Sequence, residues 1–138
     1  MQTLHIRASD TSPEIFLSPQ NNSFFIRGNS APEDVRALFY PINEWIKSFI
    51  DEIIDGKNKI FNNENPFKFQ VDLLYFNSSS AKFLYDILLE LKRLIPSGIP
   101  VIVEWIYEEG DSDMREAGVD ISILAGFDFH YISKKKTI

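Results

Sequence analysis

Three consecutive hydroxyl side chains, Ser78, Ser79 and Ser80, directly follow an apolar segment of the chain. Hydroxyl groups at such a junction can cap the first turn of a helix, which contributes about 1 kcal/mol to helix stability. They can also accept a phosphate, because the unpaired amides and partial positive charge of a helix N-terminus favour an anion. From the residue types alone, a cap at Asn77 or Ser78 is the simpler interpretation.

A phosphate at this position would change the surface of the protein and leave its fold intact. Phosphoserine adds roughly −1.5 to −2 charges, and a helix N-terminus tolerates them. The added charge would block any partner that needs an uncharged helix entrance. Lys82, four residues after Ser78, lies on the same helical face and could partly neutralise the phosphate. The simpler interpretation of Lys82 is an ordinary solvated lysine.

Residues suited to other chemistry are sparse. The chain has no cysteine, and its two histidines, His5 and His130, fall in predicted strands at opposite ends of the sequence. It contains no nucleophile-elbow motif, no histidine pair with metal-ligand spacing and no glycine-rich phosphate loop. We therefore expect no enzymatic activity, no cofactor and no metal.

An acidic loop at residues 108–113 is the one candidate for a hard cation such as Mg²⁺ or Ca²⁺. Its glycine and its acidic residues do not have EF-hand spacing. We interpret it as a solvated loop in which Asp111, Ser112 or Asp113 caps the following helix.

The composition predicts one packed domain. The chain has 138 residues, of which 44% are hydrophobic, enough to bury a core without disulfides. Its net charge of −6 disfavours binding to nucleic acid or to an anionic membrane. We expect residues 1–133 to form a single domain and residues 134–138 to form a disordered basic tail. With no leader-like or membrane-spanning apolar run, we expect a cytoplasmic location.

Hydrophobic patterns predict the first half of the fold. Residues 4–6, 14–17 and 23–27 are expected to be short strands, the last two forming a hairpin. Residues 30–33, Ser-Ala-Pro-Glu, match a capping box for an amphipathic helix that ends near residue 55. Pro41 predicts a kink or a restart in this helix. Residues 67–76 are expected to form a strand in the middle of the sheet, buried on both faces at its carboxyl end.

The second half alternates helices with strands. We expect a helix after residue 77, a central strand at 101–107, a weaker helix at 114–124 and a last strand at 127–132. This order predicts an α/β fold with a mixed, mostly parallel sheet of four to six strands and helices packed against it. Ligands usually bind where a central strand of such a sheet ends, and the serines fall there.

Four motifs in order resemble those of one known family. They are residues 28–33, Phe39-Tyr40-Pro41 followed by Trp45, residues 74–80, and residues 103–108 followed by Asp111, Asp113 and Met114. Together they resemble the bacterial SiaC-like regulatory phosphoproteins, from about residue 4 to residue 132.

The resemblance implies a STAS-like fold and a protein that catalyses nothing. It implies that a partner kinase phosphorylates the hydroxyl after the asparagine, here Ser78 with Ser79 as the less favoured alternative, and that a phosphatase removes the phosphate. It also implies that the unmodified form activates a diguanylate cyclase, which raises cyclic di-GMP and favours aggregates or biofilm. We expect partner contacts at Asn77, Ser79, Lys82 and Phe83, with Phe83 as an exposed aromatic off the apolar stripe of its helix.

Three alternatives remain open. An anti-sigma-factor antagonist would have the same fold and the same switch but a different partner. A small-ligand sensor would bind an anion at the helix entrance. An enzyme is the remotest alternative, and it would need a cation-dependent activity or a pocket that joins His130 to the acidic loop.

Overall fold

The computed structural model describes residues 1–136, which form a six-stranded sheet in the order β1-β2-β3-β4-β5-β6. The first two pairings, β1 with β2 and β2 with β3, are antiparallel, and the other three are parallel. The expected α/β class with a mixed, mostly parallel sheet is therefore confirmed, as is the predicted hairpin. The strands are β1 Leu4–Ile6, β2 Glu14–Ser18, β3 Ser23–Ser30, β4 Phe67–Phe76, β5 Val101–Glu108 and β6 His130–Lys134.

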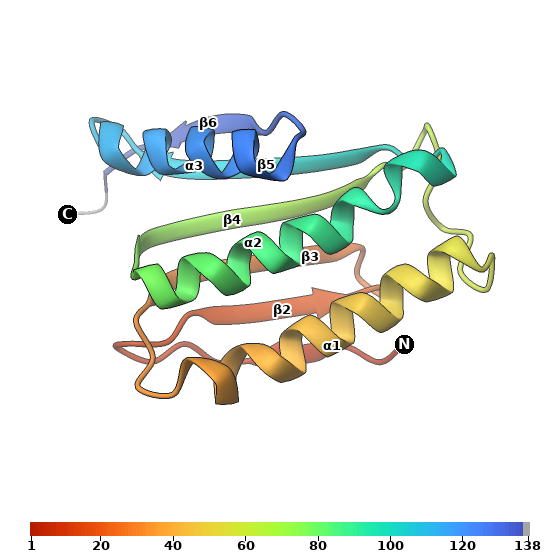
Figure 1. Ribbon diagram of the computed structural model, residues 1–138, viewed down its shortest axis with the longest axis horizontal. Helices are drawn as coiled ribbons and strands as arrows, with labels where there is room; N and C mark the ends of the chain where they lie inside the picture. The colour runs from red at the N-terminus through yellow and green to blue at the C-terminus, as the bar shows by residue number, and fades with distance from the viewer. Residues whose placement is uncertain (137–138) are drawn as a thin grey trace.

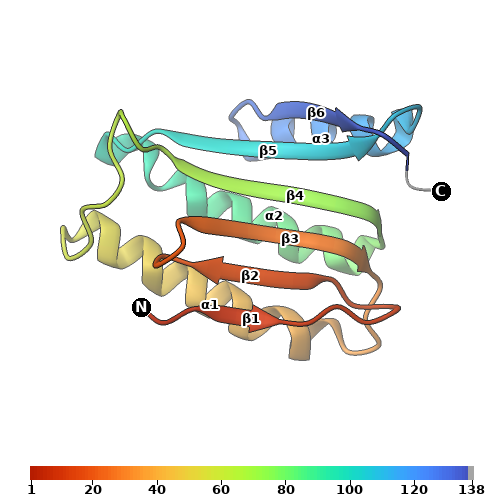
Figure 2. The same ribbon diagram turned by 180° about the vertical axis from the view of Figure 1, so that it is seen from behind.

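All three α-helices lie on the same face of this sheet, and the opposite face is uncovered (Figure 1, Figure 2). They are α1 Val35–Ile54, α2 Ser78–Lys92 and α3 Ser112–Ala125, with a short 3₁₀ turn, η1, at Ile95–Ser97. Each α-helix connects two neighbouring parallel strands, and the chain always steps in the same direction across the sheet. Because such crossovers share one hand, the helices are placed on one side.

The core lies between the helices and the covered face of the sheet. Trp105 on β5 is fully buried, and its indole nitrogen donates a hydrogen bond to the carbonyl of Met114 on α3 (2.9 Å). Gly118 makes room for this ring, because a Cβ at that position would lie 2.6 Å from the indole. Trp105 is therefore a packing residue of the core. Other large side chains buried almost completely include Phe39, Phe49, Phe69, Ile15, Leu17, Ile26, Ile42, Ile50, Leu84, Ile87 and Leu88.

The predicted capping box at residues 30–33 is wrong. Helix α1 begins at Val35, and its N-cap is Asp34, whose side chain accepts from the amide of Ala37. Ser30 is instead the last residue of β3 and is buried. The helix also continues through Pro41 without a restart.

The carboxyl end of β4 is not buried on both faces as predicted, since Leu74 is 45% exposed and Tyr75 is 54% exposed. Helices cover only one face of the sheet (Figure 2). Side chains on the other face therefore meet solvent. The register between β3 and β4 also shifts after Gly28, which pairs with Leu73, while Asn29 pairs with Tyr75. This bulge leaves Leu74 as an extra residue just before the serines.

Lys134 does not belong to a disordered tail as predicted. Lys134 belongs to β6, and its ammonium lies 2.6 Å from a carboxylate oxygen of Asp72 on β4. Residues 137–138 of that expected tail lie outside the described residues. Within residues 1–136, none of the helices has the length and apolar character needed to cross a membrane.

Candidate functional site: the entrance of helix α2

Asn77, and not a serine, caps helix α2. Its side-chain oxygen accepts from the amide of Ser80 (2.9 Å), and its carbonyl accepts from the amide of Ala81 (3.0 Å). Ser78 and Ser79 occupy the first two helical positions, and both side chains are exposed. Their hydroxyls make no hydrogen bond to another described residue, so they are free for modification or for contact with a partner.

Ser80 has a structural role. Its side chain is only 1% exposed. The hydroxyl of Ser80 donates to the carbonyl of Ser30 (3.0 Å), and the hydroxyl of Ser30 donates to that of Ser80 (2.8 Å). The same Ser30 carbonyl accepts from the amide of Asn77 (3.0 Å). These bonds fasten the entrance of α2 to the end of β3. The three serines therefore separate into two surface hydroxyls and one structural hydroxyl.

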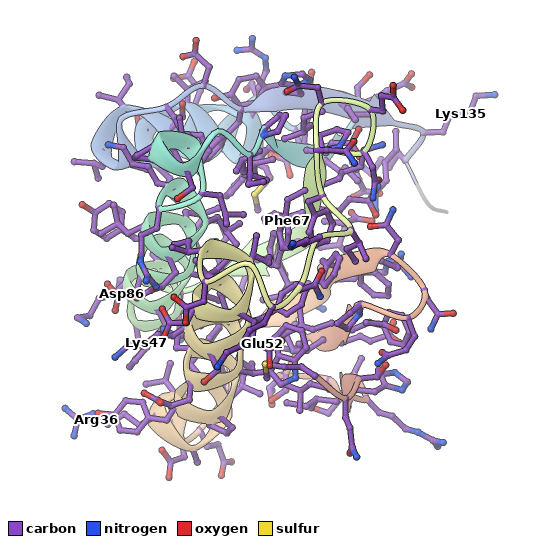
Figure 3. All side chains as sticks on the ribbon, turned by 90° about the vertical axis from the view of Figure 1, so that its right-hand side faces the viewer. Arg36, Lys47, Glu52, Phe67, Asp86 and Lys135 are labelled. Carbon is purple, nitrogen blue, oxygen red and sulfur yellow. The ribbon has the colours of Figure 1, made fainter. Side chains whose placement is uncertain are left out.

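A groove between the first turns of α1 and α2 lies beside the helix entrance, with a cavity volume of about 570 Å³. Ser79 contributes to its lining and Ser78 does not. Figure 3 shows Arg36 of α1 and Asp86 of α2 projecting on the same side of the molecule. The lining residues are Val35, Arg36, Tyr40, Asn43, Glu44, Ser79, Lys82, Phe83 and Asp86.

The prediction that Phe83 is an exposed aromatic is wrong. Phe83 is only 9% exposed and stacks on Phe39 of α1, with 5.5 Å between ring centroids and 6° between ring planes. The exposed aromatic of the groove is Tyr40, which is 55% exposed and meets the edge of Phe83 at 5.8 Å. Sequence reasoning missed Tyr40, although its position just off the buried stripe of α1 was a usable signal.

The groove is cationic near Ser79 and acidic further along. Lys82 is 71% exposed and forms an ion pair with Asp86 at 3.1 Å. Such an exposed pair contributes little to stability, so the ammonium can readily change partner. Arg36 also lines the groove and forms no ion pair with another described residue. Lys82, four residues after Ser78, and Arg36, which shares the groove with Ser79, are cations that favour a phosphate at this end of the groove.

Arg93, just after α2, fixes the far ends of the two helices relative to each other. Its guanidinium lies 2.6 Å from Asp51 on α1 and 2.7 Å from Glu90 on α2. The hydrogen bonds to Asp51 and then Glu90 raise the pKa of Arg93 above its ordinary value. Arg93 thus links the far ends of α1 and α2, away from the groove.

The other candidate chemistry does not converge on this site. Asp111 caps α3 by accepting from the amide of Met114 (3.0 Å), as expected for one of the loop residues. His5 and His130 lie on the two edge strands of the sheet. Across residues 1–136, no group of three or more histidine or acidic side chains is arranged to hold a metal ion.

The fold is that of a small mixed α/β domain with two exposed hydroxyls at the entrance of a helix. The sequence profile of the SiaC family regulatory phosphoproteins matches residues 6–134, and the chain belongs to this family. A Pseudomonas aeruginosa (strain UCBPP-PA14) protein described as uncharacterized is 29% identical over 129 residues, which cover 94% of each chain.

Solved structures from Pseudomonas aeruginosa share the fold. A chain in the crystal structure of diguanylate cyclase SiaD in complex with its activator SiaC superposes with a TM-score of 0.80 and 26% identity, covering 95% of this chain and 99% of that one. Apo-SiaC gives a TM-score of 0.77 at 26% identity, covering 96% and 99%. The chain is thus similar over nearly its whole length to a protein that activates a diguanylate cyclase.

Proposed function

We propose that this protein is a non-enzymatic signalling protein whose binding to a partner is switched by reversible phosphorylation at Ser78. The observation that carries the proposal is that different residues at the entrance of α2 have different structural roles. Asn77 provides the cap and Ser80 provides the link to β3, so the exposed hydroxyl of Ser78 has no structural task. Ser79, which is also exposed, is the less favoured acceptor.

The first turn of α2 suits a phosphorylated side chain. The amides of the first turn have no partner within the helix, and the helix dipole places partial positive charge there. Lys82 can exchange Asp86 for the phosphate, and Arg36 lies along the same groove. Phosphorylation would therefore leave the domain folded and change only its surface charge.

The groove between α1 and α2 is the proposed partner site. Its apolar surface comes from Tyr40 and Phe83, and its rim carries Ser79 and Lys82 next to Asn77. A groove between two helices fits an amphipathic helix of a partner. A phosphate at the rim adds up to two negative charges. A bound partner helix would have to remove water from these charges or lie against them, and either cost weakens binding and releases the partner.

The proposed partner is a diguanylate cyclase that the unphosphorylated form activates, raising cyclic di-GMP and favouring aggregation or biofilm. Membership of the SiaC family and the likeness to the chain of the SiaD–SiaC complex support this assignment. A protein kinase and a phosphatase would add and remove the phosphate. Because the kinase and the cyclase both use nucleoside triphosphates, we place the protein in the cytoplasm.

The test combines intact mass with partner capture in the native cell. Wild type is compared with Ser78→Ala, Ser79→Ala and Ser78→Asp. We expect the phosphorylated mass to disappear in both Ser78 variants and to persist in Ser79→Ala. Ser78→Ala should capture the cyclase constitutively, whereas Ser78→Asp should lose it. The proposal fails if Ser78→Asp retains every partner that Ser78→Ala binds.

A further inference from the structure

The solvent side of helix α3 carries the two most exposed large apolar side chains of the described residues. Ile123 is 71% exposed and Leu124 is 69% exposed, and they are adjacent in the last turns of the helix. Water-facing positions of a surface helix normally hold polar residues. Single exposed aliphatics are common, whereas two neighbouring ones form a small apolar patch that a partner could cover.

Three carboxylates precede this pair on the same side of the helix. Asp113, Glu116 and Asp120 are all exposed, while Met114, Gly118, Ile121, Ser122 and Ala125 are buried. At 3.6 residues per turn, the three acids and the two aliphatics fall within about 100° of arc. We call these five residues the α3 outer stripe. With 1.5 Å of rise per residue it is roughly 16 Å long.

The charges of the α3 outer stripe are unmatched. None of its three carboxylates forms an ion pair with another residue among 1–136. Arg115, on the same helix, lies over the ring of Tyr131 on β6, with 5.2 Å from its guanidinium carbon to the ring centroid. Lys92 of α2 stands near Gly126, beyond the C-terminal end of the helix.

The α3 outer stripe is also separate from the groove at the α2 entrance. Helix α3 covers the β5–β6 side of the sheet, helix α1 covers the β1–β2 side, and α2 lies between them (Figure 1). A protein bound to α3 therefore leaves the groove between α1 and α2 accessible.

We propose that the α3 outer stripe docks a basic amphipathic helix of a second protein. Lysine or arginine side chains of that helix would face Asp113, Glu116 and Asp120, and apolar side chains one to two turns further on would cover Ile123 and Leu124. Charge complementarity selects this occupant. A second copy packed with its α3 parallel would bring the same carboxylates face to face, and one packed antiparallel would set them against Ile123 and Leu124. An anionic membrane would be repelled by the carboxylates.

The test uses the full chain and two synthetic peptides of identical composition. One peptide places its lysines and leucines on one helical face, and the other distributes them around the helix. Binding is measured by fluorescence anisotropy against wild type and Ile123→Ser/Leu124→Ser. The amphipathic peptide should bind wild type, and the double variant should bind it at least tenfold more weakly. Circular dichroism and thermal unfolding should show the variant folded, because both side chains are exposed.

A second pair of variants tests whether binding depends on the carboxylates of the α3 outer stripe or on the overall negative charge of the protein. Asp113→Asn/Glu116→Gln/Asp120→Asn should weaken binding at least tenfold and flatten its salt dependence. The matched control Asp10→Asn/Glu33→Gln/Glu64→Gln removes as many exposed carboxylates elsewhere and should bind like wild type.

Four results would overturn the proposal. They are no binding of the amphipathic peptide to wild type, equal binding of the scrambled peptide, equal loss in the control variant, and a wild-type dimer that Ile123→Ser/Leu124→Ser abolishes. The last would identify a second copy as the occupant. Ser78→Asp should bind the peptide like wild type, so the outcome is independent of the phosphorylation switch.

Discussion

Ser30 and Ser80, fifty positions apart in the chain, share a buried pair of hydrogen bonds, with 2.8 Å between the two hydroxyls and 3.0 Å from the Ser80 hydroxyl to the Ser30 carbonyl. This contact fixes the end of β3 against the first turn of α2. It also turns Ser80 inward and leaves Ser78 and Ser79 on the surface.

Ser80→Ala should destabilise the protein by about 1–3 kcal/mol, because the buried Ser30 hydroxyl loses its acceptor. Ser79→Ala, the matched control on the surface, should change stability by less than about 0.5 kcal/mol. Urea unfolding followed by circular dichroism measures both. An unfolding free energy for Ser80→Ala equal to that of wild type would contradict the structural role of Ser80.

Ser78→Asp should leave the domain folded and raise its unfolding free energy by about 0.3–1 kcal/mol relative to Ser78→Asn, since the carboxylate meets the positive end of the α2 dipole. The comparison isolates charge, because asparagine and aspartate have nearly the same shape. The difference should shrink in 1 M salt. A large destabilisation in Ser78→Asp would mean that phosphorylation acts by unfolding the helix entrance.

Tyr40→Ala should weaken binding of the proposed cyclase at least tenfold while changing stability little, because the ring is largely exposed in the groove. Phe83→Ala should instead cost about 3–5 kcal/mol of stability, since Phe83 is buried on Phe39. Calorimetric binding and thermal unfolding separate the two effects. If Tyr40→Ala binds the cyclase like wild type, the groove is not the partner site.

Gly118→Ala should destabilise the protein by about 1–3 kcal/mol, because the new methyl group would lie 2.6 Å from the indole of Trp105. The double variant Gly118→Ala/Trp105→Phe should cost less than the sum of the two single changes, as a smaller ring makes room. Denaturant unfolding of wild type, the two single variants and the double variant completes this double-mutant cycle. Additive losses would show that the two residues do not compete for space.

Local sequence patterns were sufficient to predict those elements whose determining contacts are local. Alternation in Phe67, Phe69 and Val71 predicted β4, and the spacing of Ile42, Ile46 and Ile50 predicted α1. The mostly parallel sheet followed from the order of these elements. The predictions of Ser78 as acceptor and of its kinase, phosphatase and cyclase come from family resemblance and remain predictions.

Predictions failed where a contact distant in sequence outweighed a local motif. Ser30 fits a capping box by residue type, yet it ends β3 and bonds to Ser80 from another element. Phe83 falls off the apolar stripe of α2, yet Phe39 on the neighbouring helix buries it. Leu74 belongs to a strongly apolar strand, yet a bulge and a sheet with one uncovered face expose it.

The sequence by itself determined that hydroxyl side chains stand where a central strand ends and a helix begins. It could do so because the hydrophobic periods of a strand and of a helix are set by residues close together in the chain. Residue type and spacing could not separate a structural serine from the surface serines, since all three have the same chemistry and lie next to one another. Only the tertiary structure set Ser80 apart from Ser78 and Ser79. Asn77 takes the cap, β3 brings Ser30 to Ser80, and the direction of the first helical turn leaves Ser78 and Ser79 facing solvent.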